Sequence, residues 1–142
     1  MKLLLIEDIY PQGELVEEKL KEAFNCEVVW IATESECRSG IKEIEAFAPD
    51  VAVIDVMLKW AEAESATALP PKGWERYQAG IRCQALLAEN EGTRGIPVIF
   101  YTILSREDLA ATLPEFPPGV SQVSKDSNLE PLFRRIREVT VS

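Results

Sequence analysis

The stretch Val51-Ala52-Val53-Ile54-Asp55 places an acidic residue directly after four consecutive apolar residues. Apolar runs of this length, bounded by turn or helix signals, are typical of strands buried on both faces of a parallel sheet. Three further segments end in polar groups: residues 3–6 before Glu7 and Asp8, residues 98–101 before Thr102, and residues 120–124 before Lys125. Parallel sheets bind ligands outside the carboxyl ends of their strands. The pattern therefore predicts that three acids, a hydroxyl and an ammonium group converge on one site, which would suit a divalent cation and a phosphoryl group.

Helical periodicity separates these segments, and residues 28–31 form one more apolar run. Helices are expected over residues 11–24, from a capping box at Thr33 to Pro49, over residues 74–89, from Ser105, and through residues 132–139. The alternation predicts one doubly wound α/β domain with five strands, five helices and right-handed crossovers. The expected inner face of the third helix consists of Tyr77, Ile81, Ala85 and Leu86.

Composition limits the function classes that this chain can serve. The 142 residues carry a formal net charge of −9, which argues against nucleic-acid binding because no broad basic surface is available. No segment approaches the length of a membrane span. Cys26, Cys37 and Cys83 lack metal-ligand spacing, which favours reduced thiols in a cytoplasmic protein. The absence of histidine excludes an internal Ser-His-Asp site, a histidine-ligated metal and a self-contained phosphohistidine relay.

Residues 59–72 do not fit a minimal connection between a strand and a helix. They are polar, rich in alanine, and end in Pro70-Pro71-Lys72. Ordinary connections of this kind have about 2–6 residues, so we interpret the segment as an insertion between the third strand and the third helix. Because it follows Asp55 closely, we hypothesise that it covers the pocket there, and slows autodephosphorylation or selects the phosphoryl donor.

The order of these motifs resembles the receiver domain of two-component response regulators, which has the chemotaxis-type flavodoxin-like fold. The motifs that carry the resemblance are residues 4–8, 49–58, 97–102 and 124–126. The resemblance covers the chain apart from the insertion. It implies a single domain over residues 1–142 and a parallel sheet in the order 2-1-3-4-5.

The resemblance also implies a role for each site residue. Asp55 matches the phosphoacceptor, which takes a phosphoryl group from a phosphohistidine on a sensor histidine kinase or a phosphotransfer protein. Asp8 and Asp55 match direct Mg²⁺ ligands, joined by the backbone carbonyl of Met57, and Glu7 matches an acid that holds the metal through water. Thr102 and Lys125 match the groups that contact the phosphoryl oxygens. These residues are those that Mg²⁺ and phosphoryl transfer require.

A receiver of this kind would at most phosphorylate and dephosphorylate itself, so it would not be a turnover enzyme. We expect a stand-alone cytoplasmic regulator that contacts neither nucleic acid nor membrane, with a homodimer as an open alternative. Its downstream target is not identified by the sequence. Signalling would then pass through a surface, most often that of the last strand and last two helices.

Departures from the family pattern keep a second function open. Ile103 stands where receivers usually have a small residue, Gln122 where they have a switch aromatic, and Asp126 where they have proline. These departures and the insertion favour a phosphorylation-independent receiver that acts as a protein-interaction module. Two other classes fit less well. A haloacid-dehalogenase-like phosphatase needs an acid at Met57, and a flavodoxin would not place Glu7 and Asp8 against its phosphate.

Overall fold

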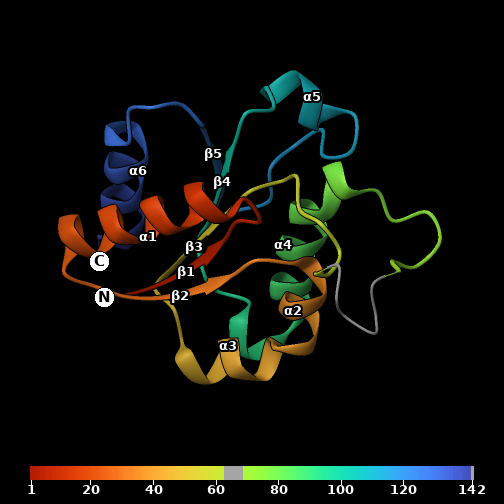
Figure 1. Cartoon of the computed structure of the whole chain (residues 1–142), viewed down its shortest axis with the longest axis horizontal. Helices are drawn as coiled ribbons and strands as arrows, with labels where there is room; N and C mark the ends of the chain where they lie inside the picture. Colours follow the sequence, from red (N-terminus) through yellow and green to blue (C-terminus); the bar gives the residue numbers. More distant parts are fainter. Residues whose placement is uncertain (63–68, 142) are drawn as a thin grey trace.

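The computed structural model describes residues 1–62 and 69–141, and these residues build a parallel sheet in the order β2-β1-β3-β4-β5 (Figure 1). The predicted strand order is therefore confirmed. Residues 63–68, within the predicted insertion, lie outside the described residues, as does residue 142. The strands are β1 (Lys2–Ile6), β2 (Glu27–Ile31), β3 (Val51–Ile54), β4 (Val98–Thr102) and β5 (Val120–Ser124).

Helices cover both faces of this sheet (Figure 1). The α-helices are α1 (Tyr10–Phe24), α2 (Glu34–Ser39), α3 (Ile41–Phe47), α4 (Ala79–Glu89), α5 (Arg106–Ala110) and α6 (Glu130–Thr140), with short 3-10 helices η1 (Arg76–Gln78) and η2 (Glu91–Thr93). α1 and α6 bury Leu20 and Ile136 against one face. The α2, α3, α4 and α5 helices pack against the other face, where Ile44 and Phe100 are fully or almost fully buried.

The helix expected between Thr33 and Pro49 is divided into α2 and α3. Its start agrees with the prediction, because the Thr33 hydroxyl accepts a hydrogen bond from the Glu36 amide at 3.1 Å. The division falls at Gly40, where an added Cβ would lie 2.8 Å from the Glu36 carbonyl oxygen. Since glycine also costs about 1 kcal/mol in a helix interior, the break at this position has a local cause.

The third helix begins later than predicted, and its most buried face is shifted from the predicted one, although Ile81 and Leu86 still pack against the core. α4 starts at Ala79 rather than near Trp74, and the buried residues are Ala79, Gly80, Cys83, Gln84 and Leu87. Tyr77, expected on the inner face, is 48% exposed. The face is set by Gly80, whose amide donates to the Val56 carbonyl at 2.8 Å. A pattern of apolar side chains cannot indicate a contact between two backbones, and this explains why the buried face of α4 was predicted incorrectly.

Among the described residues, no helix combines the length and the apolar character that crossing a membrane would require.

The close approach at Gly80 generates a test of the fold. A Cβ at this position would lie 2.2 Å from the Asp55 carbonyl oxygen, and backbone atoms cannot move aside as a side chain can. We expect Gly80→Ala to lower the free energy of unfolding by about 2–3 kcal/mol, measured by urea denaturation. Gly95→Ala is the matched control, because an added Cβ there meets nothing within 4 Å. Equal stability of the two variants would contradict this account of the α4 face.

Candidate functional site

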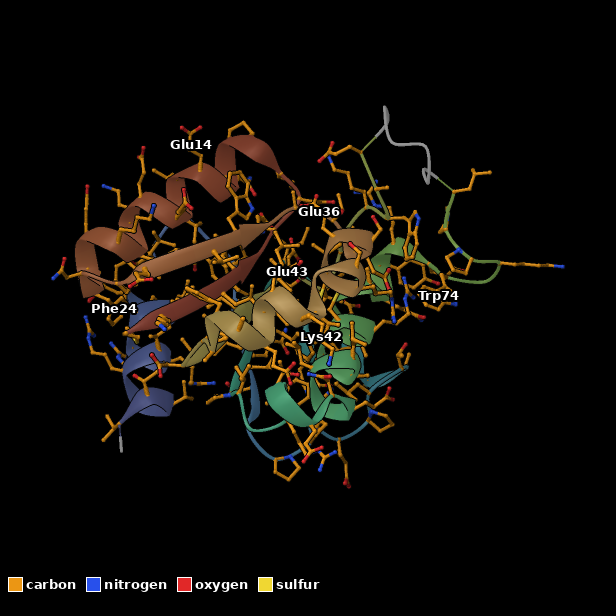
Figure 2. The ribbon with its side chains drawn as sticks, turned by 90° about the horizontal axis from the view of Figure 1, so that it is seen from below. Glu14, Phe24, Glu36, Lys42, Glu43 and Trp74 are labelled. Carbon is orange, nitrogen blue, oxygen red and sulfur yellow. The ribbon has the colours of Figure 1, made fainter. Side chains whose placement is uncertain are left out.

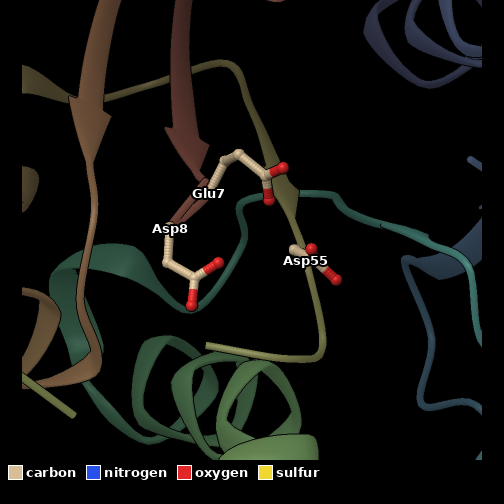
Figure 3. A group of neighbouring side chains, drawn as sticks. All are labelled: Glu7, Asp8 and Asp55. Atoms are coloured by element: carbon tan, nitrogen blue, oxygen red, sulfur yellow. The ribbon is translucent and has the colours of Figure 1, made fainter. Parts of the chain in front are cut away.

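The acidic residues meet because β1 and β3 are adjacent, parallel and in register. Ile6 pairs with Ile54, so the residues that follow these two strands leave the sheet at the same edge. The Asp55 amide donates to the Ile6 carbonyl at 2.9 Å, which extends the pairing to the phosphoacceptor candidate. Figure 3 shows the carboxyl groups of Glu7, Asp8 and Asp55 around a common space. One oxygen from each lies within 4.8 Å of the others, and all three residues are buried.

Lys125 completes this cluster from the end of β5. Its amide donates to the Thr102 carbonyl at 2.9 Å, which fixes the backbone beside β4. Its ammonium nitrogen donates to Asp55 Oδ2 at 2.9 Å and also to Glu7 Oε1. Burial alone would lower the pKa of Lys125, but the charges and hydrogen bonds of Asp55 and Glu7 outweigh that effect and raise it. Lys125 is therefore a permanent cation of the site.

Glu7 is the acid that is most perturbed by these surroundings. Burial, followed by the hydrogen bond and charge of Asp55, raises the pKa of Glu7 to about 8, against the opposing effect of Lys125. Within the described residues, Glu7 Oε2 has no hydrogen-bond partner. Two ionised carboxylates have no hydrogen-bond donor between them, and a proton on Glu7 would supply one. In the absence of metal, the raised pKa favours the protonated form of Glu7 near neutral pH.

The chemistry of this donor set fits Mg²⁺. Mg²⁺ prefers oxygen ligands, takes one or two carboxylates, and retains several waters. Asp8 and Asp55 offer such oxygens, and the unpartnered Glu7 oxygen is placed to accept a hydrogen bond from a metal-bound water. The Met57 amide donates to Asp55 Oδ1 at 3.2 Å, which orients that carboxylate. The expectation that the Met57 carbonyl joins the ligand set stays a prediction.

Comparison of the sequence with family models and with curated proteins finds no significant match. The structure, in contrast, is similar to solved receiver domains over almost its whole length. The non-phosphorylated HemR receiver domain from Leptospira biflexa is 22% identical, with 99% of this chain and 94% of that chain covered and a TM-score of 0.66. The chain has the receiver-domain fold.

Two further receivers have the same relation to this chain. The Francisella response regulator 1452 receiver domain is 18% identical, with 98% and 95% of the two chains covered and a TM-score of 0.67. TrrA from Thermotoga maritima, a response regulator solved in complex with Mg²⁺-BeF, is 16% identical, with 97% of both chains covered and a TM-score of 0.66. The similarity concerns the fold, because the identities are low.

Thr102 occupies the position that the receiver resemblance assigns to the phosphoryl-binding hydroxyl. It is fully buried, and its Oγ1 accepts a hydrogen bond from the Leu104 amide at 3.3 Å. The Leu104 carbonyl accepts in turn from Gln122 Nε2 at 2.7 Å. Gln122, which replaces the usual aromatic, therefore ties β5 to the loop after β4 by a polar contact. Ile103, between Thr102 and this loop contact, is 73% exposed.

Two groups that no sequence motif indicates contact Asp8. The Lys59 amide donates to Asp8 Oδ2 at 2.8 Å, and the Arg76 guanidinium donates to the same oxygen at 3.2 Å. These two residues lie at or just beyond the two ends of the predicted insertion. The length of the insertion and its start beside Asp55 were the available signals, but they did not indicate which residue on the returning side reaches the site.

The raised pKa of Glu7 predicts how stability depends on pH. The unfolded carboxyl has an ordinary pKa near 4.5 and the folded one a pKa of about 8. The bound proton therefore stabilises the fold fully when the pH is below the pKa of the unfolded carboxyl. This stabilisation is lost as the pH rises through the pKa of the folded carboxyl. Without divalent cations, we expect the urea midpoint to fall more between about pH 6 and pH 8.5 than in Glu7→Gln.

Glu7→Gln is the appropriate control for this measurement, because a carboxamide resembles the protonated carboxyl and does not titrate. The difference between the two slopes has an upper limit of about 1.4 kcal/mol per pH unit for a single proton. Parallel pH profiles for the two proteins would show that Glu7 is ionised in the folded state at neutral pH.

Proposed function

We propose that the chain is a response-regulator receiver in which Asp55 accepts a phosphoryl group, with Mg²⁺ bound at Glu7, Asp8, Asp55 and the Met57 carbonyl. The observation that carries the proposal is the convergence of three buried carboxyl groups with the Lys125 ammonium at the carboxyl ends of parallel strands. Burying such a group of charges costs free energy, and this cost favours a role in ligand binding over a purely structural one. The receiver-domain fold of the solved relatives supports the same function.

The donor would be a phosphohistidine on a sensor histidine kinase or a phosphotransfer protein, since the chain itself contains no histidine. An Asp55 oxygen attacks phosphorus in line with the phosphorus–nitrogen bond. The new phosphorus–oxygen bond forms as the bond to the imidazole breaks, and the imidazole leaves with the electron pair. Lys125 neutralises charge on the phosphoryl oxygens, and Thr102 donates to one of them. The bound Mg²⁺ supplies further positive charge, so that catalysis consists of positioning and electrostatic stabilisation.

The domain organisation, the cellular location and the partners belong to the same proposal. We assign residues 1–142 to a single receiver domain with an insertion at about 59–72, acting in the cytoplasm. The net charge of −9 favours protein partners over direct contact with nucleic acid. A second copy of the chain is an alternative partner.

A phosphorylation-independent receiver is the second candidate function, because two contacts favour it. Arg76 already pairs with Asp8, and Gln122 stands where a switch aromatic would report phosphorylation. In this case the domain would act through a protein-binding surface. The charges of the acidic residues would be neutralised by Arg76 and Lys125, without a metal.

Beryllofluoride distinguishes the two functions, because it forms a phosphoryl-like adduct with a carboxylate only where Mg²⁺ and the surrounding cations are in place. We expect wild type with Mg²⁺ and beryllofluoride to give a bound fluorine NMR signal, and Asp55→Asn to give none. Acetyl phosphate should add a phosphoryl mass to the peptide that contains Asp55. If neither adduct forms on the wild type, the interaction-module function is the correct one.

Metal binding is tested separately by thermal stability. A ligand that binds the folded state at ten times its Kd adds about 1.4 kcal/mol, so Mg²⁺ at that concentration should raise the Tm of this 142-residue chain by about 5 °C. Asp8→Ala should abolish the Mg²⁺-induced rise, whatever its own Tm, because it removes a direct ligand. A rise of equal size in both proteins would locate the metal elsewhere.

A further inference from the structure

We propose that Arg76 is a built-in cation of the acidic site, which pairs with Asp8 in the metal-free protein and thereby weakens the binding of Mg²⁺. The inference rests on the proposed metal site and adds a residue that the receiver resemblance does not supply. It assigns to the segment that returns from the insertion a role in setting the metal affinity.

The contact between Arg76 and Asp8 joins an exposed side chain to a buried one. Arg76 Nη2 lies 3.2 Å from Asp8 Oδ2, with the Arg76 side chain 64% exposed and that of Asp8 4% exposed. The arginine therefore approaches from solvent, and its guanidinium reaches the buried carboxylate. The same Asp8 oxygen accepts from the Lys59 amide at 2.8 Å. Both flanks of the insertion thus donate to one oxygen of a proposed metal ligand.

The backbone of Arg76 is fixed close to the site. Its carbonyl accepts a hydrogen bond from the Leu58 amide at 3.0 Å, and Leu58 is fully buried just beyond β3. Arg76 also opens η1, which leads directly into α4. A fixed backbone reduces the entropy that the side chain loses when it pairs with Asp8. The guanidinium is therefore held at a high local concentration beside the acids.

A second anchor holds the residues just before Arg76. Figure 2 shows Trp74 beside α4, and the Arg38 and Arg82 guanidinium carbons lie 4.3 Å and 5.0 Å from its ring centroid. Arg82 also binds the buried Glu34 carboxylate at 2.7 and 2.8 Å and donates to the Glu75 carbonyl at 2.8 Å. This cluster ties residues 74 and 75 to α2 and α4. The position of Arg76 is thus part of the packed structure.

The charges of the site explain why Arg76 opposes the metal. Lys125 contacts both Asp55 and Glu7, and Arg76 pairs with Asp8, so that every acid of the cluster contacts a cation. A divalent cation that binds Asp8 must either displace the guanidinium or lie close to its positive charge. Both routes cost free energy, although the exposure of Arg76 to solvent screens the repulsion. We therefore expect a moderate weakening of Mg²⁺ binding and not its loss.

The test compares the Mg²⁺ dissociation constants of wild type, Arg76→Gln, Arg76→Lys and Arg94→Gln by calorimetry and tryptophan fluorescence. Trp30 is a suitable reporter, because its indole nitrogen donates to the Glu7 carbonyl at 2.8 Å. We expect Arg76→Gln to lower the Kd for Mg²⁺ about fivefold. Arg76→Lys keeps the charge and should bind less tightly than Arg76→Gln. Arg94→Gln removes the same charge from an exposed residue that follows η2, far along the chain, and should match wild type.

The outcomes separate this inference from the proposed function. Tighter binding by Arg76→Gln with unchanged binding by Arg94→Gln supports the inference, and so does Mg²⁺ binding that appears only in Arg76→Gln. If wild type binds Mg²⁺ and Arg76→Gln binds it equally or more weakly, the inference is overturned while the metal site stands. If no variant binds Mg²⁺ in either measurement, the metal site and the inference both fall. The Tm of each variant is measured without metal as the control that the fold is retained.

Discussion

Mutual repulsion among three buried carboxyl groups is the constraint to which the rest of the site responds. The register of β1 and β3 forces Glu7, Asp8 and Asp55 to leave the sheet together, with oxygens within 4.8 Å of one another. Two unit charges about 4 Å apart repel by about 4 kcal/mol at an effective dielectric constant of 20. A cluster of this kind persists only if its charge is neutralised. Lys125, directly after β5, and Arg76, in η1, supply positive charge, and the raised pKa of Glu7 favours its protonated form.

These three means of neutralisation differ in how easily a metal can replace them. The Lys125 side chain is only 12% exposed and its backbone is joined to β4, so we expect it to remain in place when a ligand binds. Glu7 can lose its proton when a metal binds, because its raised pKa lies close to neutrality, and Arg76 can turn outward because most of its side chain is already exposed. The site thus combines a fixed cation with two exchangeable ones. That division would suit the proposed function, in which the site binds a divalent cation and a phosphoryl group.

The strand order and the residues that gather at the sheet edge could be predicted because both depend on local features. A short buried strand needs a run such as residues 51–54, and the residue after it must face the carboxyl edge. The face of α4 could not be predicted, since it depends on Gly80 approaching the backbone at Asp55 and not on a stripe of apolar side chains. The pairing of Arg76 with Asp8 spans 68 residues and follows an insertion, so no periodicity indicates it.

The replacement of the switch aromatic by Gln122 changes how the site is connected to the outer surface of β5. Thr102 Oγ1 accepts from the Leu104 amide and keeps its own proton, so it can still donate to a phosphoryl oxygen without giving up this bond. The Leu104 carbonyl is held by Gln122, which lines a surface hollow together with Arg106 and Arg135. The Gln122 side chain is hydrogen-bonded to the Leu104 carbonyl, so a shift of Leu104 must either carry Gln122 with it or break this hydrogen bond. Two hydrogen bonds, through Leu104, thus link the buried Thr102 hydroxyl to Gln122 in the surface hollow.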